Sequence, residues 1–405
     1  MKQKLKRNKG ITLIALILTI IVLLILAVVA ISTVMGEGII SHAKNARNDY
    51  TKAQANEQAR LDEYSDYLDT ESSKMNGGKT GAKTLKDNLN KELSTTANTP
   101  LTDDFGNKIK VPAGFKIITK TETENTDLNY TADTIDVTKG IVVEDEEGNQ
   151  FVWIPVGTIY TNTEKTASKT IKLGRYESFE KTNNAYTVAQ NASDYGTEVD
   201  ISSYREDTTE SHSSSLTNSI ANNIGDFCTK SNSNGGYYIG RYEARTGTER
   251  ETGEDTLTPV TLKANDYVYN WITQPKASER CQSMYTNKPF KSDLVNSYAW
   301  DTAIIFLQEF GETSDYASKT SVNSSLANTG TSGTSYTGTK DVICNVYDMA
   351  SNCWEWTTET YYGWASAPAT GRGGTYQRGG CTSRRGSNHE YEPFVDYSFR
   401  PVLYM

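Results

Sequence analysis

The chain has 405 residues, of which 36% are hydrophobic, and a formal net charge of −9 at pH 7. This length predicts two or three structural units. The first ten residues hold five Lys or Arg and no acidic residue, so residues 11–405 carry a net charge of −14. An acidic body excludes general binding to nucleic acid through phosphate neutralisation.

An uncharged apolar segment occupies residues 11–31, "ITLIALILTIIVLLILAVVAI". At about 1.5 Å per residue, such a helix spans a hydrocarbon layer of roughly 30 Å. The basic residues before it are expected to stay cytoplasmic. The segment therefore predicts a single-pass protein of the cell membrane with an extracellular C-terminal head. A cleaved secretory signal fits less well, because the apolar run is long and no A-x-A site follows.

The stretch "KGITLIAL" resembles the N-terminus of type IV prepilins and pseudopilins. The resemblance implies that a prepilin peptidase cuts after Gly10 and leaves Ile11 as the new N-terminus. That family usually carries Glu at the fifth mature position, where this chain has Ala15. The departure favours a membrane-tethered protein over a fibre subunit.

The rest of the chain is divided by composition. A run without Gly or Pro that is rich in helix-forming residues predicts a helical stalk, and polar Gly- and Asn-containing segments predict a linker. β-branched and aromatic runs bounded by Gly, Pro and Asn then predict strands. The expected units are a leader at 1–10, a transmembrane helix at 11–31, a stalk at 32–74, a linker at 75–107 and a folded domain at 108–405.

Local elements are expected within the folded domain. "EEGN" predicts a hairpin turn between Val142–Val143 and Phe151–Trp153. Helices are predicted near 219–230 and over Asp293–Gly311, the second capped by Ser292 or Asp293. The Ser/Thr-rich segments 161–235 and 312–340 are expected to be long loops outside the regular core. The acidic stretch "EDEEGN" is expected to be solvated.

Four stretches in order resemble the formylglycine-generating enzyme (sulfatase-modifying factor) domain. They are "FVWIPVGTIY", "YYIGRYEA", "NVYDMASNCWEWTTE" and "GRGGTY" followed by "SFRPV". The resemblance implies an α+β, C-type-lectin-like fold with little regular structure, carried on the N-terminal transmembrane helix and stalk. Its motif residues are read as structural: Asn345, Asp348, Asn352, Trp354, Glu355, Trp356, Arg372, Phe399 and Arg400.

Enzymes of this family are copper-dependent oxidases that use a cysteine pair after the "GGS" motif, since two thiolates suit Cu(I). The corresponding positions here hold Arg378 and Ser383, or in a second register Arg384 and His389, and Cys381 stands alone. The resemblance therefore leans away from catalysis. Two alternatives stay open: an oxidase-type enzyme with an unrecognised site, and a structural minor pseudopilin.

The C-terminal segment is rich in Arg, Tyr, Gly and Ser, as binding surfaces are. It also resembles the variable proteins of diversity-generating retroelements, whose varied residues precede a closing "FRPV"-like strand. We expect an adhesin-like protein that binds an extracellular protein or glycan. No cofactor is predicted, although some relatives carry structural calcium. The candidate ligand-binding residues are Tyr376, Arg378, Arg384, Arg385, Asn388, His389 and Tyr391.

Overall fold

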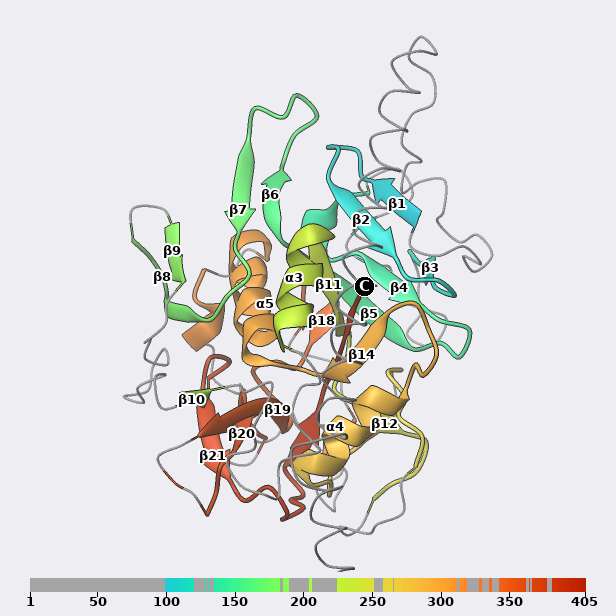
Figure 1. The fold of residues 1–405 in the computed structure, drawn as a ribbon, viewed down its shortest axis with the longest axis vertical. Helices are drawn as coiled ribbons and strands as arrows, with labels where there is room; N and C mark the ends of the chain where they lie inside the picture. Colours follow the sequence, from blue (N-terminus) through green and yellow to red (C-terminus); the bar gives the residue numbers. More distant parts are fainter. Residues whose placement is uncertain are drawn as a thin grey trace, which may run out of the picture. The chain divides into compact units, whose positions relative to one another are not determined.

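The computed structural model divides the chain into two compact units, Met1–Gly81 and Ala82–Met405. It describes part of the second unit, which is shown in Figure 1. The described residues are 99–119, 128, 130, 135–182, 185–188, 204–205, 224–250, 258–264, 266–311, 314–318, 328–329, 335–336, 342–361, 364, 366–376 and 381–405.

A six-stranded antiparallel sheet lies at the centre of the described structure. Its central strand, β5, reads "QFVWIP" and is buried along its whole length, as a continuous apolar run predicts for a strand covered on both faces. The strands are, in spatial order, β14 (Lys291–Leu294), β23 (Pro401–Tyr404), β11 (Gly236–Gly240), β5 (Gln150–Pro155), β4 (Val142–Glu144) and β3 (Lys116–Ile117).

The predicted hairpin in this sheet is confirmed. Strands β4 and β5 pair with Val142 opposite Val152 and Val143 opposite Phe151. The turn is closed by the Gly148 N–H, which donates to the Asp145 carbonyl at 3.1 Å. Gly148 has a φ of 84°, a left-handed conformation that glycine adopts without a Cβ clash.

A second sheet carries the C-terminal motifs. Strand β19 carries the "WEWTTE" end of the tryptophan motif, and β22 runs parallel to it with Trp354 opposite Tyr397. The other neighbours are antiparallel. The strands are β10 (Tyr204–Arg205), β19 (Trp354–Tyr361), β20 (Ala369–Arg372), β21 (Arg385–Asn388) and β22 (Tyr397–Phe399).

Short strands surround these two sheets. A four-stranded sheet has the order β12 (Arg245–Thr246), β13 (Tyr267–Val268), β16 (Ser335–Tyr336) and β15 (Asn328–Thr329). Four two-stranded pairs are β1 (Thr99–Thr102) with β2 (Lys108–Val111), β6 (Gly157–Tyr160) with β7 (Ser168–Ile171), β8 (Tyr176–Thr182) with β9 (Ala185–Val188), and β17 (Val342–Ile343) with β18 (Val346–Tyr347).

Three α-helices occur among the described residues: α3 (Ile224–Ser233), α4 (Gln274–Ser283) and α5 (Ser297–Phe310). Short 3-10 turns occupy Val137–Lys139 and Tyr316–Ser318. Tyr237 on β11 packs on Phe227 of α3 and donates its hydroxyl to the Ala299 carbonyl of α5 at 2.5 Å. Helices α3 and α5 therefore cover the same face of the central sheet (Figure 1).

Helix boundaries differ from the sequence predictions. The segment 291–294 is a strand, and α5 starts later, capped by Asn296, whose Oδ1 accepts the Ala299 N–H at 2.8 Å. Helix α4 was not predicted, because its "QPKASERCQS" sequence is polar and its apolar face is short. Strand β1 lies within residues 75–107, the segment expected to be a linker.

The predicted fold class, α+β on an N-terminal transmembrane helix and stalk, is wrong for the described residues. They form a mostly β structure, because short β-branched and aromatic runs pair into sheets. None of their helices is long and apolar enough to cross a membrane. The longest has 14 residues, or about 21 Å against a layer of roughly 30 Å.

The same finding contradicts the predicted location as a single-pass membrane protein with an extracellular head. The described residues do not include the expected leader, transmembrane helix and stalk, at 1–10, 11–31 and 32–74. The expected processing site at Gly10 and Ile11 is outside them too.

Candidate functional site

A buried ionic cluster underlies the C-terminal strands. Asp301 of α5 and Glu359 of β19 each accept from both Arg372 of β20 and Arg385 of β21, at 2.6 to 3.2 Å. These four side chains are fully buried. Arg175, before β8, also reaches Glu359 at 2.5 Å. The cluster joins one helix, three strands and a loop.

The electrostatics of this cluster favour an ionised Glu359. Burial by itself would raise the pKa of Glu359, but the guanidinium groups of Arg385, Arg175 and Arg372 outweigh it and lower the pKa to about 2. Each carboxylate contacts two buried guanidinium groups. Hydrogen bonds between a planar guanidinium and a carboxylate are strong and strongly directional. The cluster therefore sets the positions of the strands that carry it.

The same residues hold the loop before β21. The Trp300 indole N–H donates to the Thr382 carbonyl at 2.9 Å. Arg372 donates to the carbonyls of Ser383, at 3.2 Å, and Arg384, at 3.0 Å. With its backbone fixed from the inside, this loop presents the exposed side chain of Arg384 on the outside.

A second buried cluster lies where the chain passes from β22 to β23. Arg400 forms a charge pair with Glu355 at 2.5 Å and donates to the carbonyls of Gly240 and Tyr347 at 2.8 Å each. Glu243 lies nearby and accepts from Asn352 Nδ2 at 2.5 Å and from the Cys353 N–H at 3.0 Å. Arg400 thus ties the tryptophan motif to the central sheet.

The turn residues of the tryptophan motif have unusual backbone conformations. Asn345, Asp348 and Asn352 have φ values of 65°, 63° and 69°. Asn and Asp tolerate this left-handed region better than other non-glycine residues. Asn345 also donates its side-chain amide to the Gly140 carbonyl at 2.8 Å. Every motif residue read as structural in the sequence is buried in the described structure.

Several exposed or partly exposed side chains lie on β21, close to it in sequence, or between β19 and β20 in the chain. We call Trp364, Arg384, Asn388, His389 and Tyr391 the aromatic surface. Trp364 is 54% exposed and Tyr391 is 53% exposed, and they are two of the three large hydrophobic side chains reported as exposed among the described residues. The rings of Trp364 and His389 meet edge to face, with centroids 6.3 Å apart.

The backbone beneath this surface is anchored. The Gln274 N–H of α4 donates to the Glu390 carbonyl at 3.2 Å, and Asn270 donates its side-chain amide to the Val395 carbonyl at 3.0 Å. Arg384 places its guanidinium 5.0 Å from the centroid of Trp354, whose ring in turn stacks on Tyr397. The backbone next to Arg384 and Tyr391 is therefore held by hydrogen bonds to neighbouring elements.

The predicted ligand-binding residues differ in their exposure to solvent. Arg384, Asn388, His389 and Tyr391 are partly or fully exposed. Tyr376 is 7% exposed and Arg385 2%, so these two face the interior. Arg378 lies outside the described residues. Sequence reasoning missed Trp364, although a tryptophan in the polar, turn-rich stretch "YYGWASAP" is a usable signal of an exposed aromatic residue.

Two cysteines and two glutamates near the tryptophan motif and α4 are enclosed. Burial raises the pKa of the Cys281 and Cys353 thiols well above the usual range, which leaves them poor nucleophiles. The carboxyl groups of Glu243 and Glu355 are also fully buried. No group of three His, Cys, Asp or Glu side chains that could hold a metal ion is found in the part of the chain that the structure describes.

Comparison with known proteins gives little. No family model matches the chain, and no curated protein matches it significantly. Among solved structures, the crystal structure of CarF is similar over 30% of this chain, at 20% sequence identity and a TM-score of 0.23. The match spans 49% of that chain, about half its length, and carries no argument about fold or function.

Proposed function

We propose that this protein is an adhesin-like, non-catalytic ligand-binding protein that contacts another protein or a glycan through its aromatic surface. The observation that carries the proposal is the exposure of Trp364 and Tyr391, together with Arg384, whose backbone the buried ionic cluster holds. Trp, Tyr and Arg are the residues most enriched at binding hot spots.

The rigidity of aromatic side chains and of anchored backbone also supports binding. Rigid aromatic side chains give large contact areas at a small cost in conformational entropy. A binding surface on pre-organised backbone also loses less entropy on association than a surface on a mobile loop. Aromatic faces suit the apolar faces of sugar rings as well as protein side chains, so both ligand classes remain in the proposal.

The resemblance to formylglycine-generating enzymes and to variable proteins of diversity-generating retroelements supports the same proposal. On this view, residues 375–392 form a diversified segment. The structure suggests which positions in it accept change: Arg384, Asn388, His389 and Tyr391 are partly or fully exposed. Arg385 and Tyr376 are buried, and we expect substitutions there to disturb folding.

Sequencing the coding locus across isolates tests the diversification. We expect adenine-confined codon changes at the exposed positions, beside a reverse transcriptase and a template repeat. An invariant segment without such neighbours would contradict diversification but would leave binding through the aromatic surface to be tested separately.

Binding is tested with the full chain on a glycan array and a displayed peptide library. For a ligand found in this way, Trp364→Ala or Tyr391→Ala is expected to weaken binding by about 1–3 kcal/mol, or roughly 5- to 150-fold. Val342, the third exposed hydrophobic residue at 41%, provides the control Val342→Ala. Equal binding by all three variants would rule out the aromatic surface as the binding site.

A further inference from the structure

The turn before α4 contains a tryptophan in an unfavourable backbone conformation. Trp271 has a φ of 52°, and it is the one aromatic residue with a positive φ in the described part of the chain. A bulky residue in this left-handed region is an outlier. Such strain costs free energy and is concentrated at binding sites and active sites. Trp271 is therefore a candidate for a functional residue that the aromatic surface does not include.

Neighbouring groups hold this conformation. The buried side chain of Arg250 donates from Nε to the Asn270 carbonyl at 2.9 Å and from Nη2 to the Trp271 carbonyl at 3.2 Å. The guanidinium also lies 4.5 Å from the centroid of the Tyr269 ring. These contacts reach the backbone of the turn, and none of them involves the indole of Trp271. The turn is thus fixed independently of the tryptophan ring.

The indole ring has no structural partner that accounts for the strain. The Trp271 side chain is partly exposed and belongs to none of the hydrophobic clusters of the described structure. Within the described residues its ring makes no aromatic contact and its N–H makes no hydrogen bond. Both the ring and the N–H donor of Trp271 are therefore available to a ligand.

Trp271 lies in a segment that runs beside the one that carries Tyr391. The Trp271 N–H donates to the Phe394 carbonyl at 3.0 Å, and the Gln274 N–H donates to the Glu390 carbonyl at 3.2 Å. These two bonds align the segments in antiparallel order. Tyr391 is 53% exposed. Two accessible aromatic side chains therefore come from adjacent segments.

Polar groups accompany these aromatic side chains. Thr273 occupies the cap position of α4, but its side chain makes no cap bond and is partly exposed. On the facing segment the Glu392 side chain is exposed, and no hydrogen bond of its carboxylate occurs in the part of the chain that is described. The two segments thus offer aromatic rings, a hydroxyl group and a carboxylate that can accept hydrogen bonds.

We propose that Trp271 and Tyr391 bind a neutral hexose unit of a glycan. A hexose has an apolar face of C–H groups and a rim of hydroxyl groups. The apolar face packs on the aromatic rings, and the hydroxyl groups bond to Thr273 and Glu392. This inference rests on the proposed function, because Tyr391 belongs to the aromatic surface, and it selects the glycan from the two ligand classes.

The chemistry of the two segments favours a neutral sugar over the other ligands. The negative charge of Glu392 would repel the carboxylate of an acidic sugar. Aromatic hot spots of protein interfaces are surrounded by contacts that exclude water. Here the groups beside the rings are the accessible polar side chains of Thr273 and Glu392, which suit the hydroxyl groups of a sugar.

Fluorine NMR on the full chain labelled with fluorotryptophan tests binding at Trp271. The chain has six tryptophans, and comparison with Trp271→Phe assigns the resonance. The probes are D-glucose, D-galactose, D-mannose and N-acetyl-D-glucosamine, each titrated to about 100 mM. With at least one sugar we expect the Trp271 resonance to shift, with a dissociation constant of about 10 mM or tighter. The resonances of the fully buried Trp153 and Trp300 should stay unchanged.

Variants assign the contacts, with binding followed by saturation-transfer NMR of the sugar. Trp271→Ala and Tyr391→Ala are expected to weaken binding at least about tenfold. Trp271→Phe keeps an aromatic face and should be intermediate. Val342→Ala changes an exposed hydrophobic residue outside both segments, and it should bind as the parent does. Urea unfolding of each variant verifies that it is folded.

The backbone strain predicts an unusual order of stability. Glycine usually destabilises a protein relative to alanine, because it loses more conformational freedom on folding. At a φ of 52° glycine is unstrained and alanine is not, so Trp271→Gly should have a higher urea midpoint than Trp271→Ala. Both variants lack the indole and should bind the sugar equally weakly.

Three results would overturn the proposal. They are no shift of the Trp271 resonance with any of the four sugars, unchanged sugar binding by folded Trp271→Ala, and a lower urea midpoint for Trp271→Gly than for Trp271→Ala.

Failure of this inference is distinguishable from failure of the proposed function. Ligand binding that is lost in Trp364→Ala, with no shift of the Trp271 resonance, would contradict the inference and leave the proposed function standing. Sugar binding that is lost in Trp271→Ala and kept in Trp364→Ala would support the inference and count against Trp364 as the centre of the binding surface.

Discussion

Glu243 is a buried carboxyl group whose protonation affects stability. Burial, with Glu355 and Asp348 nearby, raises its pKa well above the usual value of a glutamic acid side chain. Above pH 4.5 the native state therefore holds a proton that the unfolded chain has lost. The contribution to stability is complete below the unfolded pKa and declines as pH rises through the folded pKa.

We predict that Glu243→Gln reduces the loss of unfolding free energy between about pH 5 and about pH 8. Asn352 Nδ2 now faces Glu243. When the Asn352 side-chain amide turns over, the introduced amide can donate to Asn352 Oδ1, a buried acceptor that has no partner within the described residues. Urea unfolding at a series of pH values measures the effect. A variant with the same pH slope as the parent would show that Glu243 is not the titrating group.

At the scale of elements, α5 shows how the cap of a helix depends on its surroundings. The sequence favoured Ser292 or Asp293 as the cap, but both lie in β14, where Ser292 pairs with Leu403 and Asp293 with Val402. Asn296 occupies the cap instead. The Ser292 hydroxyl is buried without a hydrogen-bond partner among the described residues.

We therefore predict opposite results for two nearby substitutions. Asn296→Ala removes a cap bond and is expected to lower the unfolding free energy by about 1 kcal/mol. Ser292→Ala removes a hydroxyl that makes no bond and is expected to be neutral or slightly stabilising. Midpoints of urea unfolding at constant m-value compare them. If Ser292→Ala lowers the unfolding free energy more than Asn296→Ala does, Ser292 and not Asn296 is the residue that stabilises the start of α5.

At the scale of the whole molecule, the ionic cluster joins segments that are far apart in sequence. Arg175 and Glu359 are separated by 184 residues, and Asp301 and Arg385 by 84. Removing one partner of a buried charge pair leaves the other uncompensated, which is more costly than the pair itself is stabilising.

We predict that Glu359→Gln lowers the unfolding free energy by about 3–5 kcal/mol at neutral pH. Because the folded pKa of Glu359 is about 2, its contribution is present above the unfolded pKa and is lost as pH falls towards 2. The variant should lack this part of the acid dependence, as followed by urea unfolding from about pH 6 to about pH 2.

The control is Glu144→Gln, since Glu144 forms a partly exposed pair with Lys116 at 3.2 Å. Exposed pairs contribute about 0–1 kcal/mol, so the control should change little. If the two variants lose equal stability, the cluster does not have the central role assigned to it.

The sequence by itself determined the local features of this protein. Continuous apolar runs on either side of a Gly-containing turn specified the β4–β5 hairpin. Asn and Asp at the turns of the tryptophan motif match their left-handed backbone. These features depend on neighbouring residues, so a short stretch contains the information. The sequence also pointed to Arg384, Asn388, His389 and Tyr391, which are partly or fully exposed.

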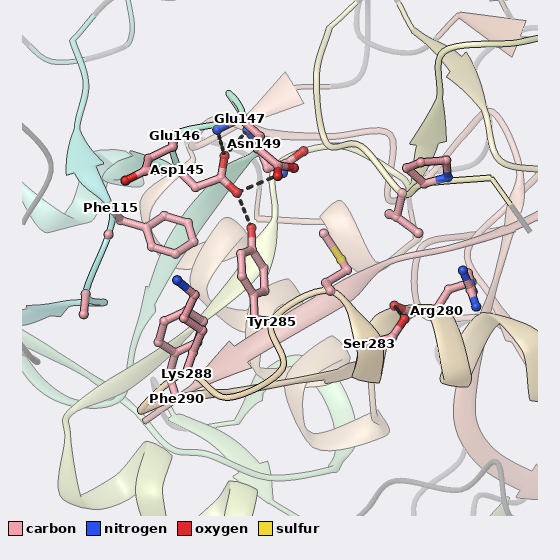
Figure 2. A pocket seen from close by; sticks show the side chains of 15 residues that line it. Phe115, Asp145, Glu146, Glu147, Asn149, Arg280, Ser283, Tyr285, Lys288 and Phe290 are labelled. Atoms are coloured by element: carbon pink, nitrogen blue, oxygen red, sulfur yellow. Dashed lines mark hydrogen bonds between the residues drawn. The ribbon is translucent and has the colours of Figure 1, made fainter.

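Only the tertiary structure decided which similar residues face inward. Arg384 and Arg385 are adjacent and chemically identical, yet one is exposed and the other is buried between Asp301 and Glu359. Successive side chains of a strand point to opposite faces, and the partners of Arg385 come from distant segments. A cavity next to the β4–β5 turn (Figure 2) likewise combines residues from four separate stretches, 113–115, 145–149, 259–260 and 280–290, so its lining depends on the path of the folded chain.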